Sequence, residues 1–196
     1  MSLTAAILAG GAAQRYGGAD KSALIVDGRS ILDRQLGELS AIAAEVLIVG
    51  GGAPAVAGAR VVPDRIAHAG PLGGLHAALS ESRGSVTVVI ACDMPFVTAG
   101  LLDYLASLAG RADVVVPRTE DGYHPLCAAY TRACLDPVAR RVAERRLQVA
   151  ALFDEVHVRV VTLEEMARFG DPHRLLANVN TPDEYRQIAA FQHHQL

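Results

Sequence analysis

The sequence has few cysteines, and their arrangement excludes two kinds of small scaffold. Only three occur among 196 residues, Cys92, Cys127 and Cys134. They are odd in number and form neither a CxxC pair nor a Cys/His zinc spacing, which argues against a disulfide scaffold and a structural metal site. We therefore expect reduced thiols and a cytoplasmic protein.

The sequence also lacks an excess of positive charge and a long apolar run. Its 18 Lys and Arg against 21 Asp and Glu give a net charge of −3, so a broad basic face for nucleic acid is not expected. No apolar run approaches the roughly 20 residues that cross a bilayer, and glycines interrupt the apolar start, which has no basic leader region. We expect neither nucleic acid nor a membrane as a partner.

The remaining composition is that of a folded protein. Hydrophobic residues make up 51% of the chain and the mean hydropathy is +0.25, which excludes intrinsic disorder. There is no internal repeat, linker or low-complexity tract, so residues 1–196 are expected to form a single domain.

Strand and helix patterns alternate through the first two-thirds of the chain. Strands are predicted at 3–9, 45–50, 59–64, 85–93 and 112–117, and helices at 30–44, from Pro71 onward and at about 99–108. This order specifies an α/β fold with a mostly parallel, right-handed, doubly wound sheet and helices on both faces. The second half is less regular, with strands at 124–130 and 156–161 and helices at 131–146 and 182–191, the last capped by Thr181.

A glycine-rich segment leaves the first strand and is the strongest candidate for a ligand site. The stretch LAGGAAQRYGGADK, Leu8 to Lys21, contains four glycines, one arginine and one lysine. In an open parallel sheet, ligands bind beyond the carboxyl ends of the strands. Glycines there let backbone N–H groups approach a phosphate, and Arg15 and Lys21 would neutralise its oxygens. We predict a phosphate cradle; the alternative is an ordinary flexible loop with solvated cations.

Two familiar nucleotide motifs do not account for this segment. No Gly-Lys-Ser/Thr follows a glycine at P-loop spacing, which excludes a Walker A ATPase. A GxGxxA match begins at Gly50, but Pro54 lies inside it and no acidic residue follows about 20 positions on to hold a ribose. We therefore discount a dinucleotide site there.

Polar residues at other strand ends supply further candidates. Asp93, in ACDMPF, ends the most strand-like segment and lies at the same sheet edge as the glycine-rich segment, where Mg²⁺ would bridge to a nucleotide. The alternative is a strand-end aspartate that caps the following turn. Asp64 ends another strand, where it could contact a nucleotide or equally be an ordinary turn residue. Asn178 and Asn180 could reach this edge or could serve turns and helix caps.

Three basic or histidine positions have weaker signals. His124 precedes a proline and a strand, so a structural histidine is as good an interpretation as a ligand contact. Arg145 and Arg146 end a predicted helix, where cations interact favourably with the helix dipole without any other role.

Taken together, the motifs resemble those of molybdenum cofactor guanylyltransferases over essentially the whole chain. LAGGAAQRYGGADK, PLGGL, VVIACDMPF, HPLCAAY and NVNTPDE occur in the order of that family. The resemblance implies a Rossmann-like nucleotidyltransferase domain that joins GMP from GTP to the terminal phosphate of molybdenum-loaded molybdopterin, with Mg²⁺, and releases pyrophosphate. It implies a nucleotide-binding half at about 1–100 and a cofactor-side half at about 101–191. Molybdoenzymes or other cofactor-biosynthesis proteins are possible partners.

The resemblance also assigns roles to residues of this chain. The acid Asp93 is the implied magnesium ligand, and Lys21 and Arg15 are the implied catalytic cations. The implied nucleotide contacts are Leu8, Ala9, Gly10, Gly11, Gly17, Lys21, Asp64 and Asp93, and the implied pterin-side residues are Asn178, Asn180, His124 and Arg145. One departure is Gly50, where some members of the family have an asparagine near the base.

Alternatives remain open at this point. A molybdopterin cytidylyltransferase or a sugar-phosphate nucleotidyltransferase would share the fold and the glycine-rich segment, although Gly10 and Gly11 in the turn favour GTP. A nucleotide-sensing module without turnover is a rival outside enzymes. The presence of both Lys21 and Asp93 argues against it, because binding alone does not need a metal carboxylate.

Overall fold

The computed structural model describes residues 2–9, 24–26, 28–50, 56–64, 66, 68–179, 181 and 184. Its main sheet has the strand order β10-β7-β9-β6-β1-β4-β5, with β8 paired to β7, and a separate hairpin pairs β2 with β3. The strands are β1 Leu3–Leu8, β2 Ile25–Val26, β3 Arg29–Ser30, β4 Glu45–Val49, β5 Arg60–Val62, β6 Val86–Ala91, β7 Val114–Thr119, β8 Gly122–Tyr123, β9 Cys127–Thr131 and β10 Val158–Val161.

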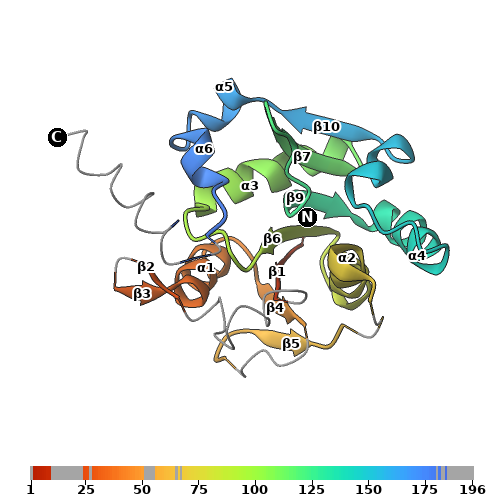
Figure 1. The fold of residues 1–196 in the computed structure, drawn as a ribbon, viewed down its shortest axis with the longest axis horizontal. Helices are drawn as coiled ribbons and strands as arrows, with labels where there is room; N and C mark the ends of the chain where they lie inside the picture. Colours follow the sequence, from red (N-terminus) through yellow and green to blue (C-terminus); the bar gives the residue numbers. More distant parts are fainter. Residues whose placement is uncertain are drawn as a thin grey trace.

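Helices and strands alternate along much of the chain (Figure 1). They are α1 Ile31–Ser40, α2 Gly70–Glu81, α3 Ala99–Leu108, α4 Leu135–Ala143, α5 Leu163–Met166 and α6 Pro172–Leu175, with 3₁₀-helices η3 Ala109–Arg111, η4 Arg132–Cys134 and η5 Ala150–Asp154. Within the described part of the chain, no helix is long and apolar enough to cross a membrane.

The centre of the sheet is buried on both faces, which explains the continuous apolar run at the start of the chain. Strand β1 pairs in parallel with both β4 and β6. Ala5 and Ile7 pack into the core on one face, while Ala6 and Leu8 pack into the core on the other. Because side chains alternate along a strand, both parities must be apolar here.

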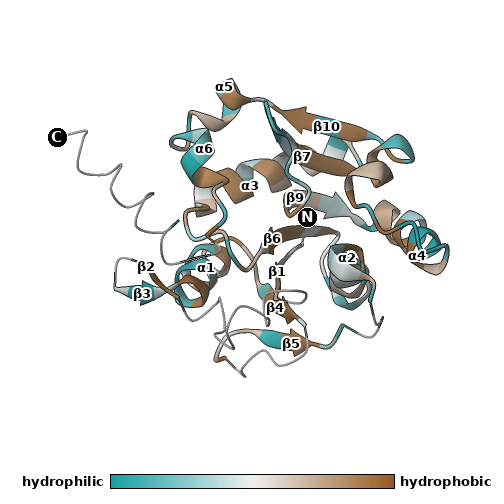
Figure 2. Cartoon of the chain, viewed as in Figure 1, coloured by the Kyte–Doolittle hydropathy of each residue, from teal (hydrophilic) through white to brown (hydrophobic). Residues whose placement is uncertain are grey.

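Helices cover both faces, as an α/β fold requires. Buried leucines of α1 and α3 join the core on one face, and those of α2, with valines of α4, join the core on the other. Figure 1 shows α1 and α3 on one side of the sheet and α2 and α4 on the opposite side. The hydropathy colouring in Figure 2 shows apolar strands between helices that carry polar residues on α1 and α4. The predicted fold class is confirmed.

One strand runs antiparallel to its neighbours within the mostly parallel sheet. The segment predicted as a strand at 124–130 forms β9, which is antiparallel to both β6 and β7 and lies between them. A parallel return needs a crossover of about a dozen residues or more. The connection from Thr119 to Cys127 is shorter than that and contains β8, which folds back on β7. The sheet is therefore mostly parallel, as the sequence predicted.

Helix boundaries agree with the predicted caps better than with the predicted lengths. The backbone N–H of Asp33 donates to Ser30 Oγ at 3.0 Å, as the predicted N-cap requires. Helix α1 nevertheless ends at Ser40 and not at 44, and the helix predicted at 131–146 is divided into η4 and α4. Thr181 Oγ1 accepts from the Glu184 N–H at 3.1 Å, as an N-cap does; most of the helix predicted at 182–191 lies outside the described residues.

A half-buried acid of α5, which pairs with Arg159 of β10, gives the fold a pH-dependent stability. Burial alone raises the pKa of Glu165, but hydrogen bonds from the Thr162 backbone N–H at 3.0 Å and the Tyr104 hydroxyl at 2.7 Å, with the Arg159 guanidinium, lower it to about 2. Because this pKa is lower in the folded state than in the unfolded state, the ionised carboxylate stabilises the fold at pH values above 4.5. This contribution to the free energy of unfolding is lost as the pH falls toward 2.

We therefore expect Glu165→Gln to be less stable than the wild type at pH 6, and the difference in unfolding free energy to shrink as the pH falls below about 4.5. Urea unfolding at several pH values measures this difference. The exposed neighbour Glu164 provides the matched control, since Glu164→Gln removes the same charge. If the difference in unfolding free energy between wild type and Glu165→Gln stayed constant across that pH range, the lowered pKa of Glu165 would be contradicted.

Candidate functional site

The carboxyl ends of three neighbouring strands are joined by backbone hydrogen bonds at one edge of the sheet. The Ala9 N–H donates to the Val49 carbonyl at 2.7 Å, and the Cys92 N–H donates to the Leu8 carbonyl at 3.2 Å. A Cβ atom added at Gly74 of α2 would lie 3.4 Å from the Leu8 side chain, so α2 packs closely on the end of β1. This edge is where an open α/β sheet binds its ligand.

Asp93 lies in the turn that follows β6 and is half-buried, with a buried Oδ1 atom. The turn is anchored to three other segments. Besides the Cys92 bond to β1, the Ala91 N–H donates to the Leu126 carbonyl at 2.8 Å and the Asp93 carbonyl accepts from the Val179 N–H at 2.7 Å. Hydrogen bonds to the end of β1, to the residue before β9 and to the C-terminal segment thus fix the backbone around Asp93.

A cavity of about 260 Å³ brings together three residues that the sequence singled out, Asp93, His124 and Asn178. Its other lining residues are Ala91, Met94, Tyr123, Pro125, Leu126 and Cys127. Asn178 reaches it because the neighbouring Val179 is hydrogen-bonded to the Asp93 turn. Residues from the middle and the last third of the chain therefore meet at one site, with a carboxylate, an imidazole and an amide around it.

His124 has a hydrogen bond that fixes its ring and an environment that favours the neutral form. Its Nε2 lies 2.9 Å from the Thr119 hydroxyl. Burial lowers the pKa of His124 from 6.5, and the nearby Asp121 carboxylate opposes this only in part. A neutral imidazole at pH 7 can orient a ligand by donating or accepting a hydrogen bond, but it does not neutralise a phosphate.

Asp64 lies in a different cavity. It is half-buried after β5, and its Oδ1 accepts from the Ile66 N–H at 3.1 Å. A Cβ atom added at Gly73 would lie 3.3 Å from both carboxylate oxygens, so Asp64 packs directly on the first turn of α2. It lines a cavity of about 140 Å³ with His76 and Glu81. Within the described residues, Asp64 and Asp93 do not share a cavity.

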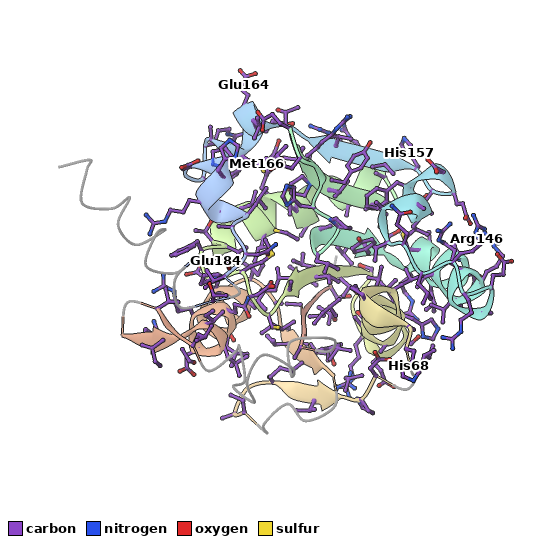
Figure 3. All side chains as sticks on the ribbon, viewed as in Figure 1. His68, Arg146, His157, Glu164, Met166 and Glu184 are labelled. Carbon is purple, nitrogen blue, oxygen red and sulfur yellow. The ribbon has the colours of Figure 1, made fainter. Side chains whose placement is uncertain are left out.

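The arginines after α4 are engaged on the protein surface. Arg146 forms ion pairs with Glu144 and Glu155, each at 3.2 Å, and Figure 3 shows it at the outer margin beside α4. Arg145 is exposed and has a left-handed backbone with φ of 59°. Neither lines the cavity that contains Asp93.

Six of the predicted site residues lie outside the described residues. They are Gly10, Gly11, Arg15, Gly17, Lys21 and Asn180. The phosphate cradle therefore stays a prediction from the sequence. Leu8 and Ala9, which begin the glycine-rich segment, lie at the sheet edge described above.

Sequence reasoning did not identify two residues that shape this site. Tyr123 lines the Asp93 cavity, and its ring packs edge-on against Phe153 at a centroid distance of 5.1 Å. Gln35 of α1 is 1% exposed and contacts the backbone on both sides of Asp93. The signal for Gln35 was its place in the apolar stripe of the helix, where a polar residue needs buried partners.

The described residues contain no group of three or more His, Cys, Asp or Glu side chains that could hold a metal ion. Magnesium is commonly held by one or two carboxylates together with substrate phosphates and water. One half-buried carboxylate at a ligand-binding edge fits that requirement.

The protein is a Rossmann-like α/β domain with polar residues gathered beyond its strand ends. Residues 5–160 match the model of the MobA-like NTP transferase domain family, and the chain belongs to that family. A probable molybdenum cofactor guanylyltransferase from Pelotomaculum thermopropionicum is 36% identical over 94% of this chain and 90% of its own length. A molybdenum cofactor guanylyltransferase from Desulfosudis oleivorans is 31% identical over 96% and 95%.

A solved structure agrees in fold. The crystal structure of molybdopterin-guanine dinucleotide biosynthesis protein A from Archaeoglobus fulgidus superposes with a TM-score of 0.79 at 23% identity, covering 97% of this chain and 98% of that one. The similarity spans both halves of the chain. The predicted family resemblance is confirmed.

Proposed function

We propose that this protein transfers GMP from GTP to the terminal phosphate of molybdenum-loaded molybdopterin and releases pyrophosphate. Family membership and relatives named for this activity support the proposal. The observation that carries it is the shared cavity of Asp93, His124 and Asn178, since it joins the proposed nucleotide side to the proposed acceptor side. We also propose that residues 1–100 bind the nucleotide and residues 101–191 bind the acceptor, with Asp93 on the first side of this cavity and His124 and Asn178 on the second.

The reaction needs positioning and charge neutralisation more than a covalent nucleophile. An oxygen of the acceptor phosphate bonds to the α-phosphorus of GTP, and the bond from that phosphorus to the bridging oxygen breaks, so pyrophosphate leaves with the electron pair. The attacking phosphate is already ionised at pH 7, so no general base is required. His124, held by Thr119, and Asn178 orient the acceptor by hydrogen bonds. Asn180 and Arg145 complete the proposed acceptor-side set.

On the nucleotide side, Lys21 and Arg15 counter the charge that develops on the departing pyrophosphate, and the backbone amides of Gly10, Gly11 and Gly17 complete the cradle. Leu8, Ala9 and Gly10 contact the base and ribose, and Asp64 is a further nucleotide contact. Asp93 would hold Mg²⁺. When bound, the ion neutralises and orients triphosphate oxygens.

We place the reaction in the cytosol, where thiols stay reduced. None of the three cysteines forms a disulfide. Burial raises the pKa of the Cys127 and Cys134 thiols to about 12, which keeps them protonated and unreactive. The proposed protein partners are a receiving molybdoenzyme or another protein of cofactor biosynthesis.

The choice of base is tested by thermal stability. Any ligand of the folded state stabilises it by mass action. At a hundredfold excess over Kd, the free energy of unfolding rises by about 2.7 kcal/mol. For a domain of this size that corresponds to roughly 5–10 °C. We expect GTP to give the largest shift among the four nucleotides at equal concentration, because the Leu8-Ala9-Gly10-Gly11 turn offers backbone groups to guanine.

Pyrophosphate release with each nucleotide and loaded molybdopterin then tests turnover. An equal or larger shift and turnover with CTP would favour the cytidylyltransferase. Binding of GTP without any pyrophosphate release would favour the nucleotide-sensing module.

A further inference from the structure

Gln35 is a buried amide that holds the Asp93 turn from the helix side. It lies in the middle of α1 and is 1% exposed. Its Nε2 donates to the Ala91 carbonyl at 2.7 Å and to the Met94 carbonyl at 3.0 Å. These carbonyls lie on either side of Asp93, so the two hydrogens of one amide group close the turn that carries this carboxylate.

The position of Gln35 is costly for the helix. It occupies the buried stripe of α1 with Ile31, Leu32 and Leu39, where an apolar side chain would pack without desolvating polar atoms. Its Oε1 is buried and has no hydrogen-bond partner among the described residues. An unsatisfied buried acceptor destabilises a fold, so packing alone does not explain a glutamine here.

Neighbouring side chains on α1 hold the next part of the same segment. Arg34 Nε donates to the Pro95 carbonyl at 3.2 Å, and Glu38 Oε2 accepts from the Ala99 N–H at 2.6 Å at the start of α3. Figure 1 shows α1 beside the connection that runs from β6 to α3. Helix α1 therefore anchors the segment from the end of β6 to α3, and Gln35 is the member of this set that spans Asp93.

We propose that Gln35 is a positioning residue for Asp93. By fixing the Ala91 and Met94 carbonyls, it sets the direction in which the Asp93 carboxylate faces the cavity shared with His124 and Asn178. This inference rests on the proposed function, in which Asp93 holds Mg²⁺. Gln35 itself does not contact substrate in this role, and its effect passes through the backbone of the turn.

The first test compares Gln35→Met with Leu39→Met. Methionine is similar in length to glutamine but donates no hydrogen bond, and Leu39 lies one turn further along the same buried stripe without a hydrogen bond to the turn. We expect Gln35→Met to lower kcat roughly ten- to a hundredfold, as small misplacements of catalytic groups do. The Mg²⁺ concentration for half-maximal rate should rise, while the KM for GTP changes little. The melting temperature should fall, because the Ala91 and Met94 carbonyls lose their donor, so both variants are assayed well below their melting transitions.

A second variant separates hydrogen bonding from packing. In Gln35→Glu, a protonated carboxyl can donate one of the two hydrogen bonds, whereas an ionised carboxylate repels both carbonyl oxygens. Burial raises the pKa of such a group. We expect the rate of Gln35→Glu, as a fraction of the wild-type rate at the same pH, to rise as the pH falls from 8 to 6. Normalising to wild type cancels titration of groups common to both proteins, such as Asp93, Cys92 and Arg34, and Gln35→Met should show no such rise.

Amide hydrogen exchange gives a readout that does not depend on activity. The Val179 N–H donates to the Asp93 carbonyl, so its exchange should accelerate in Gln35→Met and not in Leu39→Met. Wild-type kinetics and exchange in Gln35→Met, with an inactive Asp93→Ala, would overturn this inference alone. A fully active Asp93→Ala would overturn the proposed role of Asp93 and this inference with it.

Discussion

Replacing Asp93 with alanine is expected to lower turnover by on the order of a thousandfold or more, because it removes a metal-centred charge that acts at the transition state. The fold should be retained. The Cys92 bond to Leu8 and the bond from Val179 to the Asp93 carbonyl involve only backbone atoms, which alanine keeps. Steady-state rates of pyrophosphate release as a function of Mg²⁺ concentration, with melting temperatures for each protein, measure both expectations.

The control for this variant is Asp103→Ala. Asp103 is exposed on α3, so the substitution removes the same charge from the surface without touching the cavity. We expect near wild-type turnover and stability. Near-normal activity in Asp93→Ala would show that the carboxylate does not hold a required metal ion.

The sequence predicted the central sheet well because its signals there are local. The apolar runs at β1 and β6 are long and flanked by glycine or proline, so their type, their burial on both faces and their shared edge could be derived without tertiary information. The direction of β9 could not be predicted from the sequence, for the opposite reason. Its orientation depends on the length of the connection after β7 and on the pairing of β8, which side-chain periodicity does not report.

The site shows the same division between local and nonlocal information. Asp93, His124 and Asn178 could be named from motifs, but their meeting in one cavity depends on β9 lying beside β6 and on Val179 bonding to the Asp93 turn. Gln35 was missed because its partners are 56 and 59 residues away in the sequence. Asp64 has the local signal of a strand-end acid, and it lies against α2 in a separate cavity.

The cradle gives the second large expected effect. Lys21 is the only lysine in the chain, which otherwise uses arginine for its cations. A compact ammonium at the end of a glycine-rich segment suits contacts to phosphate oxygens. Hydrogen bonds to charged groups contribute about 1.5–3 kcal/mol, so Lys21→Ala should weaken GTP and GDP roughly ten- to a hundredfold and leave guanosine nearly unchanged. Calorimetric titration of the three ligands measures this pattern.

Turnover should fall further than GTP binding does, because the pyrophosphate gains charge as it leaves and the contact strengthens in the transition state. Arg111→Ala is the control, since it removes one exposed positive charge at η3 and should alter neither binding nor rate. Because Lys21 has no other lysine to compete with it, amine acylation followed by mass spectrometry can follow it beside the N-terminal amine, and GTP should protect it. A uniform change across guanosine, GDP and GTP, or acylation of Lys21 at the same rate with and without GTP, would reject the phosphate role. No change in the binding of any of the three would mean that Lys21 is a solvated surface cation, whose removal costs under about 1 kcal/mol.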